Sequence, residues 1–451
     1  MSTVPPSAGH PASAGPGPGA PAGRSGAVDR PGRLGAAFGR LWGAAAVSTV
    51  GDGMTLTAVP LLAATLTRDP VAISLVNGVS FLPWVVVGLL SGALVDRWDR
   101  RRTMWTVDLA RAVVIAGLAA AVLAGAASIP LLCVAVFLLG CGQTLFDSAA
   151  QAAIPAVVSR DPVRLHRANG RMIGTQTLGQ SFIGPPVGGA LFPLAHWLPF
   201  AADAVSFLSS SALVGSLRGR FEPAASQPGA DGHRVRRSVR ADIAEGIRWL
   251  FRHRFLRLMA IIACILNFAG AAAYGLLVLF AQDRLGLGSV GFGLLLSAEA
   301  VGALAGSAVA GRVSRRLGTT RAMASAMLVQ TGAVAAFGTT REISVAVVAA
   351  AAQAGAIGVW NVLGQSLRQE LTPSRLMGRV VTSFRMVGLG GIPVGALCGG
   401  FLARAYGLTA GYLLAAAMGL LATVLAAAVL TERALATARA GTEPTGTQAT
   451  G

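Results

Sequence analysis

The chain contains no lysine, and charged residues of any kind are scarce. All 37 basic residues are arginine, 19 residues are acidic, and charged residues make up 12% of the 451 residues. A soluble domain carries about twice that charged fraction, so the composition excludes an ordinary soluble globular protein. Hydrophobic residues make up 53% of the chain and the mean hydropathy is +0.63. They fall in long runs, which indicates a protein that crosses a membrane several times.

Cysteine is also rare, and no enzyme motif is present. Cys133, Cys141, Cys264 and Cys398 each lie within an apolar run. None has the spacing of metal ligands, so we expect packing residues and no metal site. The chain lacks a P-loop, a dinucleotide-binding fingerprint and a nucleophile elbow. We therefore expect no enzyme activity and no cofactor. If the protein transports a substrate, the transport must be driven by an ion gradient or be passive.

The placement of arginine, rather than its amount, is informative. A net charge of +18 would suggest a nucleic-acid partner for a soluble protein. Here the arginines lie between apolar runs, so we expect a lipid bilayer and no nucleic acid. The first 40 residues are rich in Pro, Gly, Ala and Ser, and they lack the apolar core of a cleavable signal peptide.

The apolar runs predict an all-α membrane protein with twelve transmembrane helices. Glycine and proline are frequent within them, as such helices permit. The expected spans are residues 41–66, 71–95, 103–125, 129–157, 169–194, 197–217, 256–281, 287–311, 320–338, 343–367, 377–403 and 408–431.

The links between these spans alternate in arginine content, and this alternation predicts the orientation. The arginine-poor links are 67–70, 126–129, 195–197, 282–286, 339–342 and 404–407. The arginine-rich links are 96–102, 160–171, 218–257, 312–321 and 368–379. We expect the protein in the inner (cytoplasmic) membrane. Since arginine-rich links stay on the cytoplasmic side, both termini should face the cytoplasm.

The long middle link divides the chain into two groups of six spans. The expected parts are a disordered tail (1–37), a first bundle (38–217), a linker (218–255), a second bundle (256–433) and a disordered tail (434–451). Within the linker, Ile243, Ile247, Leu250 and Phe251 recur at helical spacing. This pattern predicts an amphipathic helix on the inner membrane surface.

The two groups repeat each other. A basic link leads into a Gly/Pro-rich span in both, first from Arg164 to Gly189 and again from Arg375 to Gly400. The link at 96–102 has a degenerate counterpart at 310–318, which keeps its arginines and lacks its acidic residue. Parallel repeats of this kind are typical of one large class of transporters.

The link after the second span carries a specific motif. It reads Gly92-Ala-Leu-Val-Asp96-Arg97-Trp-Asp-Arg100-Arg101. This resembles the G-x-L-x-D-R-x-x-R-R loop between helices 2 and 3 of the major facilitator superfamily. The resemblance covers residues 38–431 and implies two six-helix bundles, alternating access and function as a monomer. It also implies that Asp96 and the arginines latch spans 2 and 3 to span 11.

Further motifs narrow the resemblance. Gly184-Pro185-x-x-Gly188-Gly189 is similar to the span-5 signature of the antiporters, although Gly179 lies one position out of register with it. A second set of motifs resembles the enterobactin-exporter and macrolide-efflux branch. These are Gly51-Asp52-Gly53, Phe146-Asp147, Ala168-Asn169 and Ile183-Gly184-Pro185.

Acidic residues inside the spans are the candidates for proton coupling, because a charge in the bilayer core is costly without a cavity or a partner. Asp52 ranks first, since it lies near mid-depth and its glycine neighbours Gly51 and Gly53 leave room for water or substrate. The alternative is a structural role for Asp52, either paired with an arginine or capping a broken helix. Asp147 and Glu299 are the further candidates. Asp203 is expected nearer the outer end, as a cap or a paired group.

Other polar residues at membrane depth have two interpretations each. Asp108 and Arg111 are spaced i, i+3, which favours a structural pair on one helix face. Arg385 has no acidic neighbour in the sequence, so it either pairs across the bundle or meets an anionic substrate. Asn77, Asn267 and Asn361 either line the path or donate hydrogen bonds between helices.

Taken together, these features predict a proton-coupled exporter of small amphipathic molecules such as drugs, antibiotics or siderophore-like metabolites. Its partners would be the small-molecule substrate, protons and lipid. Two alternatives stay open at this stage. One is an uncoupled transporter of lipids or metabolites, and the other is a membrane protein that does not transport.

Overall fold

The protein is helical wherever the structure describes it. The computed structural model describes residues 34–88, 98–158, 161–217, 239–373 and 376–440, and no strand occurs within these ranges. A helix satisfies every backbone hydrogen bond within its own segment, which a chain needs where lipid offers no partner. The all-α prediction is confirmed.

The first half of the chain supplies helices at each of the first six predicted spans. The fifth is broken into two α-helices by a π-helical turn. The elements are α1 (Gly35–Leu66), α2 (Pro70–Val86), α4 (Arg100–Leu123), α5 (Ile129–Val158), α6 (Pro162–Thr177), η1 (Leu178–Ile183), α7 (Gly184–Leu191) and α8 (Leu198–Gly215).

The second half begins with α9 (Val239–Arg252), which lies at the predicted interfacial helix. Helices then follow at each remaining predicted span, and two of these spans are broken. The elements are α10 (Arg254–Tyr274), α11 (Leu277–Leu279), η3 (Phe280–Arg284), α12 (Ser289–Leu317), α13 (Thr319–Thr339), α14 (Ile343–Leu371), α15 (Met377–Leu389), α16 (Gly391–Tyr406), α17 (Leu408–Val429) and α18 (Glu432–Ala440).

Among the described residues, ten helical segments are long and apolar enough to cross a membrane. The two predicted spans outside this set are α2, whose described apolar part is short, and α6 to α7, which η1 interrupts. A membrane protein with many spans is therefore confirmed. The total of twelve stays a prediction.

Aspartate side chains start three of the helices. The side chains of Asp69, Asp99 and Asp161 each accept a hydrogen bond from a backbone N–H in the first turn of α2, α4 and α6. Proline follows Asp69 and Asp161 directly, where its fixed φ suits the first helical position. These acids in the links therefore have a local capping role.

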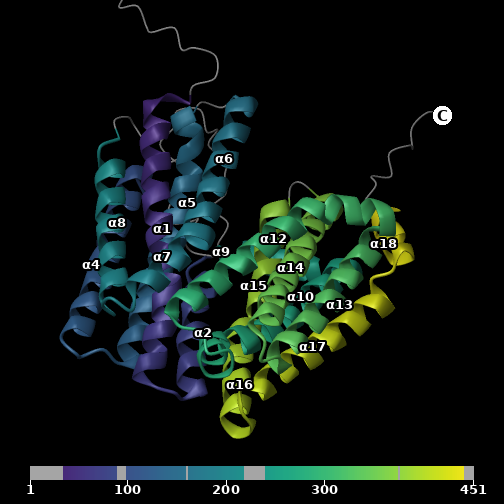
Figure 1. Ribbon diagram of the computed structural model, residues 1–451. Coiled ribbons are helices and arrows are strands. Elements are labelled where there is room, and N and C mark those ends of the chain that lie inside the picture. The colour runs from purple at the N-terminus through teal and green to yellow at the C-terminus, as the bar shows by residue number, and fades with distance from the viewer. Residues whose placement is uncertain (1–33, 89–97, 159–160, 218–238, 374–375, 441–451) are drawn as a thin grey trace, which may run out of the picture.

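The helices form two groups that lie side by side (Figure 1). In the first group α8 packs on α1 and α4, and α5 packs on α2 and α4. In the second group α14 packs on α12 and α13, and α17 packs on α10 and α13. The groups meet where α2 packs on α16 and α7 packs on α12.

Three of the links predicted to be outside meet across the two groups. The Arg68 guanidinium lies 3.3 Å from an Asp283 carboxylate oxygen and donates to Gln282 Oε1 at 2.7 Å. Arg404 lies 3.6 Å from Asp69. Links 67–70, 282–286 and 404–407 thus share one end of the molecule, which agrees with the alternation of arginine content.

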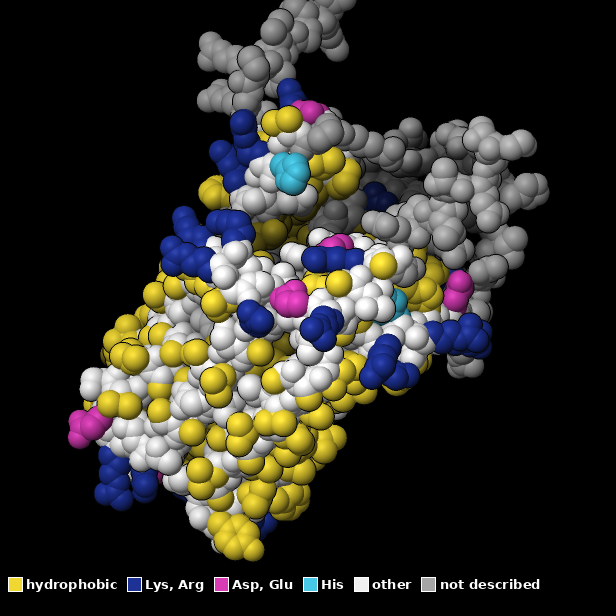
Figure 2. Space-filling view, turned by 90° about the vertical axis from the view of Figure 1, so that its right-hand side faces the viewer, with side chains coloured by type: hydrophobic (Ala, Val, Ile, Leu, Met, Phe, Trp, Pro, Cys, Tyr) yellow, Lys and Arg dark blue, Asp and Glu magenta, His cyan; other side chains and the backbone are white. Residues whose placement is uncertain are grey.

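The surface is suited to lipid. Figure 2 shows a broad zone of hydrophobic side chains, with arginines gathered along its upper side. Large apolar side chains such as Val113, Leu123 and Val348 are each more than 60% exposed. Water disfavours a contiguous apolar surface of this extent, whereas the bilayer core matches it.

Helix α9 packs partly on the protein rather than only on the membrane surface. Leu250 is fully buried. A Cβ at Gly246 would come within 2.6 Å of the Arg379 carbonyl oxygen and of Ser383 Oγ, so α9 lies close against α15. Glu245 and Arg379 form an ion pair of 2.6 Å between the same helices. The helix at this position is confirmed, but its apolar face is shared with α15.

The C-terminal region differs from the expected disordered tail. Residues up to Ala440 form α18. The Glu432 carboxylate accepts hydrogen bonds of 2.8 Å from the backbone N–H and the hydroxyl of Thr320, and so caps the start of α13. Arg439 pairs with Glu370 at 2.6 Å. These contacts are made by residues far apart in the sequence, so local composition could not reveal them.

Candidate functional site

A cavity of about 230 Å³ lies between the two groups of helices. Its wall is formed by α1, α2, α4, α5 and η1 from the first group and by α10, α11 and α12 from the second. Most of the wall is aliphatic. Its polar and aromatic members are Asp52, Thr55, Asn77, Ser80, Trp84, Arg111, Gln143, Gln180, Tyr274 and Phe292.

An ion pair joins two helices at the wall of this cavity. Arg111 of α4 donates to an Asp52 carboxylate oxygen of α1 at 2.5 Å, and the Arg111 and Asp52 side chains are 5% and 12% exposed. Gly142 of α5 makes room for Arg111, since a Cβ there would come within 2.7 Å of the arginine stem. Asp52 therefore does pair with an arginine, as the structural alternative required. The sequence did not show that this arginine is Arg111.

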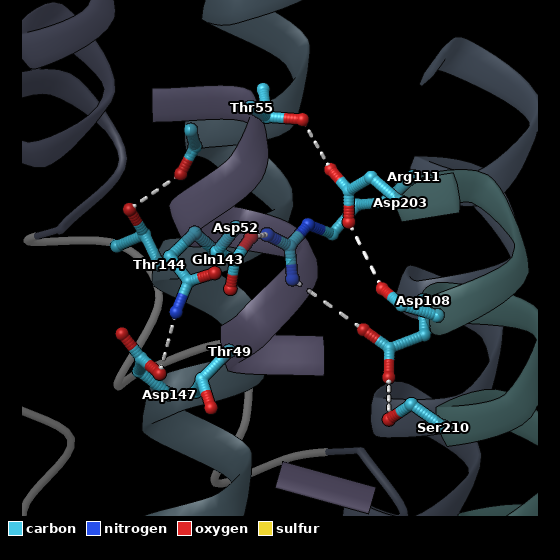
Figure 3. A network of polar contacts seen from close by, with 12 residues as sticks. Thr49, Asp52, Thr55, Asp108, Arg111, Gln143, Thr144, Asp147, Asp203 and Ser210 are labelled. Atoms are coloured by element: carbon cyan, nitrogen blue, oxygen red, sulfur yellow. Dashed lines mark hydrogen bonds and ion pairs between the residues drawn. The ribbon is translucent and has the colours of Figure 1, made fainter. Parts of the chain in front are cut away.

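Arg111 also holds a second carboxylate on its own helix. Its guanidinium lies 3.5 Å from Asp108, whose side chain is fully buried. Ser210 of α8 donates to the other Asp108 oxygen at 2.5 Å, and the Arg111 guanidinium lies 4.0 Å from the centre of the Phe207 ring. The predicted i, i+3 pair is present, and it is part of a larger network (Figure 3).

Asp203 of α8 belongs to the same network. One of its carboxylate oxygens accepts a hydrogen bond of 2.6 Å from Thr55 of α1, and the other accepts one of 2.9 Å from Ser206. Asp203 is 1% exposed. Asp203 is the sixth residue of α8, toward its Leu198 end, where it lies beside Gly51 and Thr55 of α1.

Asp147 lies on α5, on the other side of Arg111 from Asp108 (Figure 3). Gln143, one turn earlier, donates to its carboxylate at 3.0 Å. Since Gln143 also lines the cavity, Asp147 is linked to the cavity wall through this amide.

The sequence predicts room for water or substrate beside Gly51 and Gly53. The structure shows no such room. A Cβ at Gly51 would collide with Asp203 and Ser206, and a Cβ at Gly53 would come within 2.6 Å of the Gln180 carbonyl oxygen. The two glycines let α1 pack closely against α8 and η1. Small residues at membrane helix contacts commonly have this role.

The span-5 motif lies at similar close contacts. A Cβ at Gly184 would come within 2.5 Å of Gly53 Cα, and one at Gly188 within 2.6 Å of the Met54 carbonyl oxygen, both on α1. Gly189 faces α12 of the other group, where a Cβ would come within 2.5 Å of the Ser289 carbonyl oxygen. Helix α7, which begins with this motif, therefore packs on both groups.

Gly184→Ala is expected to destabilise the protein by about 1–3 kcal/mol, because the added methyl overpacks the contact between α7 and α1. The measurement is thermal unfolding of the detergent-purified protein. Gly170→Ala on α6 is the matched control, since nothing lies within 4 Å of a Cβ there. An exposed helical glycine gains stability from alanine, so a larger loss at Gly170 than at Gly184 would contradict this packing.

Glu299 lies on α12, close enough to Tyr274 and Tyr412 for its charge to act on both. Within the described part of the chain, no hydrogen bond or ion pair to Glu299 is found. It lies about two helical turns from the cavity-lining Phe292, on the same helix. The structure thus places Glu299 apart from the Asp52–Arg111 network.

The remaining candidates have different surroundings. Asn77 lines the cavity, whereas Asn267 donates to the Gly388 carbonyl oxygen at 3.1 Å and so joins α10 to α15. Arg385 reaches across the groups, with its guanidinium 5.5 Å from the centre of the Trp84 ring. Asn361 is exposed on α14.

The hairpin motif is only partly visible. Gly92, Asp96 and Arg97 lie outside the described residues, so the latch stays a prediction. Arg100 is the first residue of α4. The Arg101 guanidinium donates to the Gly215 carbonyl oxygen, and Arg40 donates to the Ser216 carbonyl oxygen at 2.8 Å. These arginines neutralise the C-terminal end of α8.

The described residues contain no group of three or more His, Cys, Asp or Glu side chains suited to a metal ion. The four cysteines are free and partly buried. The polar network is therefore one of carboxylates, hydroxyls and a single shared guanidinium, which can exchange protons and hold a charged or polar ligand.

Residues 34–444 match a protein family described as transmembrane secretion effector. An uncharacterized MFS-type transporter from Mycobacterium tuberculosis is 31% identical over 192 residues, which are 40% of this chain and 42% of that protein's length. The multidrug efflux pump Tap from Mycolicibacterium fortuitum is 27% identical over 387 residues, which are 82% of this chain and 90% of the pump.

Solved structures share the fold. The nucleoside transporter NupG superposes with a TM-score of 0.69 at 16% identity, over 87% of this chain and 98% of NupG. A bacterial homologue of the human lysosomal transporter Spinster, in an inward-facing and unoccupied conformation, gives 0.68 at 13% identity, over 89% of this chain and 98% of that one. A bacterial homologue of the iron transporter ferroportin, in an inward-facing state, gives 0.66 at 17%, over 87% and 98%.

Proposed function

Since this chain belongs to the major facilitator superfamily, within the family of transmembrane secretion effectors, we propose that it is a secondary active transporter that exports small amphipathic molecules in exchange for protons. The family and the matched relatives are transporters and not enzymes. The proposal adds three elements to that membership: the direction of transport, the class of substrate and the coupling ion.

The observation that carries the proposal is the Asp52–Arg111 ion pair at the wall of a mainly apolar cavity between the two groups. Apolar walls with a few converging polar groups are typical of small-molecule sites. Aliphatic and aromatic side chains such as Val59, Trp84 and Tyr274 suit the apolar part of an amphipathic molecule. The ion pair and Asn77 offer contacts for its polar part.

The charge balance of the network supports protons as the coupling ion. Asp52, Asp108 and Asp203 surround one guanidinium, that of Arg111. Full ionisation of the three carboxyl groups would leave excess negative charge in a site of low dielectric, which costs several kcal/mol. Binding of protons removes that excess, and Asp52 is the member that also lines the cavity.

The contacts between the groups support a cycle of alternating access. Arg68 with Asp283, and Arg404 with Asp69, join the two groups at the predicted outer end. In this state Asp52 is paired with Arg111, as suits a carboxylate that has released its proton to the cytoplasm. Substrate then binds, the groups rock, and reprotonation from outside favours release of substrate, because the two ligands favour different states.

The relatives support the direction and the substrate class. A multidrug efflux pump aligns with most of this chain, so we propose drugs, antibiotics or siderophore-like metabolites as the exported molecules. The transporter would act as a monomer in the cell membrane. Both termini and the 218–255 linker would face the cytoplasm.

The proposal is tested by transport in proteoliposomes. A panel of fluorescent lipophilic dyes and antibiotics is added, a pH gradient is imposed, and accumulation inside the vesicles is followed. We expect at least one compound to accumulate, and we expect nigericin to abolish the accumulation because it collapses the pH gradient. Accumulation that survives nigericin, or compounds that only equilibrate, would contradict proton coupling.

The proposed topology has its own test. In a background without the four native cysteines, single cysteines replace Ser128, His196, Ser226 or Thr437. A membrane-impermeant thiol reagent added to intact cells is expected to label the cysteines at positions 128 and 196 and to leave those at 226 and 437 unlabelled until the cells are broken. Labelling of the cysteine at position 226 in intact cells would contradict the orientation.

A further inference from the structure

The network contains a second carboxyl group that can carry a proton. We infer that Asp203 binds and releases a proton during the transport cycle and that Thr55 connects it to the cavity. This inference rests on the proton coupling proposed above and adds a proton site to Asp52. With two proton sites, we expect two protons to be carried in each transport cycle.

Asp203 is buried where three helices meet. It is 1% exposed, and α8 packs on both α1 and α4 along this stretch. The approach of α1 is so close that a Cβ at Gly51 would collide with Asp203 Oδ1. Asp203 therefore has no direct contact with bulk water, and its proton must travel through a neighbouring side chain.

The partners of Asp203 differ in kind from those of Asp52. Asp203 accepts hydrogen bonds from the hydroxyls of Thr55 and Ser206, and a hydroxyl can either donate or accept. The pocket therefore suits Asp203 both with and without its proton. Asp52 faces the Arg111 guanidinium, which can only donate, so its pairing is lost when it binds a proton.

The charges around Asp203 leave it without an ion-pair partner within the described residues. Asp52 faces it from α1, while Arg111 faces it from α4. The contacting segment α7 carries no titratable side chain. Arg111 is engaged by Asp52 at 2.5 Å and by Asp108 at 3.5 Å, so a proton is the remaining means of neutralising Asp203.

Thr55 provides the route. Its side chain lines the cavity and its hydroxyl donates to Asp203 at 2.6 Å. Rotation of the hydroxyl lets it accept a proton from the cavity side and pass its own proton to Asp203, with no net change at Thr55. Asp52 lies one turn earlier on the same helix, so one opening of the cavity exposes both proton sites.

Infrared spectroscopy of the purified protein tests the inference without a substrate. The C=O stretch of a protonated carboxyl group is separate from that of a carboxylate, and its intensity is followed against pH. We expect Asp203→Asn to remove one titrating band from the wild-type spectrum. Asp283→Asn, an exposed acid at the outer end, is the matched control and should leave the band in place.

Thr55→Val is a second variant for the same measurement, to be used if Asp203→Asn does not fold. Valine has the shape of threonine and lacks the hydroxyl, so the Asp203 band is expected to shift in frequency. Thr57→Val is its control, because the Thr57 hydroxyl donates to the Gly53 carbonyl oxygen of its own helix and, among the described residues, to no other acceptor. A wild-type spectrum in Asp203→Asn, or an unshifted band in Thr55→Val, would overturn the inference.

Transport separates this inference from the proposed function. With the membrane potential clamped at zero, Asp203→Asn is expected to need a pH gradient about twice as large as the wild type to hold the same substrate gradient, because one proton of two is lost. An unchanged requirement would overturn the inference while leaving proton coupling intact. A wild-type protein that ignores the pH gradient would instead overturn the proposed function.

Discussion

Asp52→Asn is expected to abolish export against a concentration gradient, reducing pH-driven accumulation to the level of protein-free vesicles. Asparagine has the shape of aspartate and no titratable proton, so the cavity loses the group at which proton and substrate exchange. Asp203 is not among the residues that line the cavity, so its proton adds to the coupling through Asp52 and does not replace it. The network keeps the Arg111–Asp108 contact of 3.5 Å, so the protein should still fold. Downhill exchange of substrate should remain measurable, because it needs no proton. The measurement is accumulation and exchange in the same proteoliposomes.

The other candidates give the comparison for this prediction. Asp147→Asn and Glu299→Gln are expected to lower uphill export less than Asp52→Asn, since neither side chain lines the cavity. Glu342→Gln, at an exposed position in the link 339–342, serves as a control for the loss of an acidic residue. Uphill export at the wild-type rate in Asp52→Asn would remove Asp52 from the mechanism and leave Asp147 and Glu299 as the candidates.

Arg111→Met is expected to destabilise the protein more than any other single change in the network. Asp52 and Asp108 would both lose their cationic partner while they stay buried, and breaking a buried ion pair on one side costs about 3–5 kcal/mol. The contact of the guanidinium with the Phe207 ring would be lost as well. Thermal unfolding in detergent and recovery of monodisperse protein are the measurements.

Rescue distinguishes this electrostatic cause from a simple change of shape. Combining Arg111→Met with Asp52→Asn and Asp108→Asn removes the uncompensated charges, and the triple variant is expected to recover a large part of the lost stability. Arg385→Met is the matched control, because the Arg385 guanidinium lies over Trp84 and is 5.5 Å from the ring centre. Equal losses for Arg111→Met and Arg385→Met would contradict the central place of Arg111.

The contrast between near and distant contacts explains which parts of the site could be predicted. Asp108 and Arg111 are three residues apart on one helix, so the helical period alone predicts their pair. Arg111 and Asp52 are 59 residues apart, and Thr55 and Asp203 are 148 apart. No periodic pattern reports contacts at that separation, because they depend on how α1, α4 and α8 pack together.

The glycines illustrate the same limit in another way. Gly51 and Gly53 pointed correctly to a special place on the first span, but the open space expected around Asp52 is filled by α8 and η1. A glycine in a membrane helix permits either a cavity or a close contact. Only the position of the neighbouring helix decides between them.

The sequence by itself determined the membrane class, the helical spans, the family motifs and the common end of links 67–70, 282–286 and 404–407. Those properties follow from local composition, since lipid demands apolar helices and charge stays out of its core. The tertiary structure decided that one guanidinium serves carboxylates from two helices and that Asp203 lies behind the cavity wall with hydroxyl partners. Such choices arise from packing between helices, where the burial of one side chain depends on every neighbour and not on its own segment.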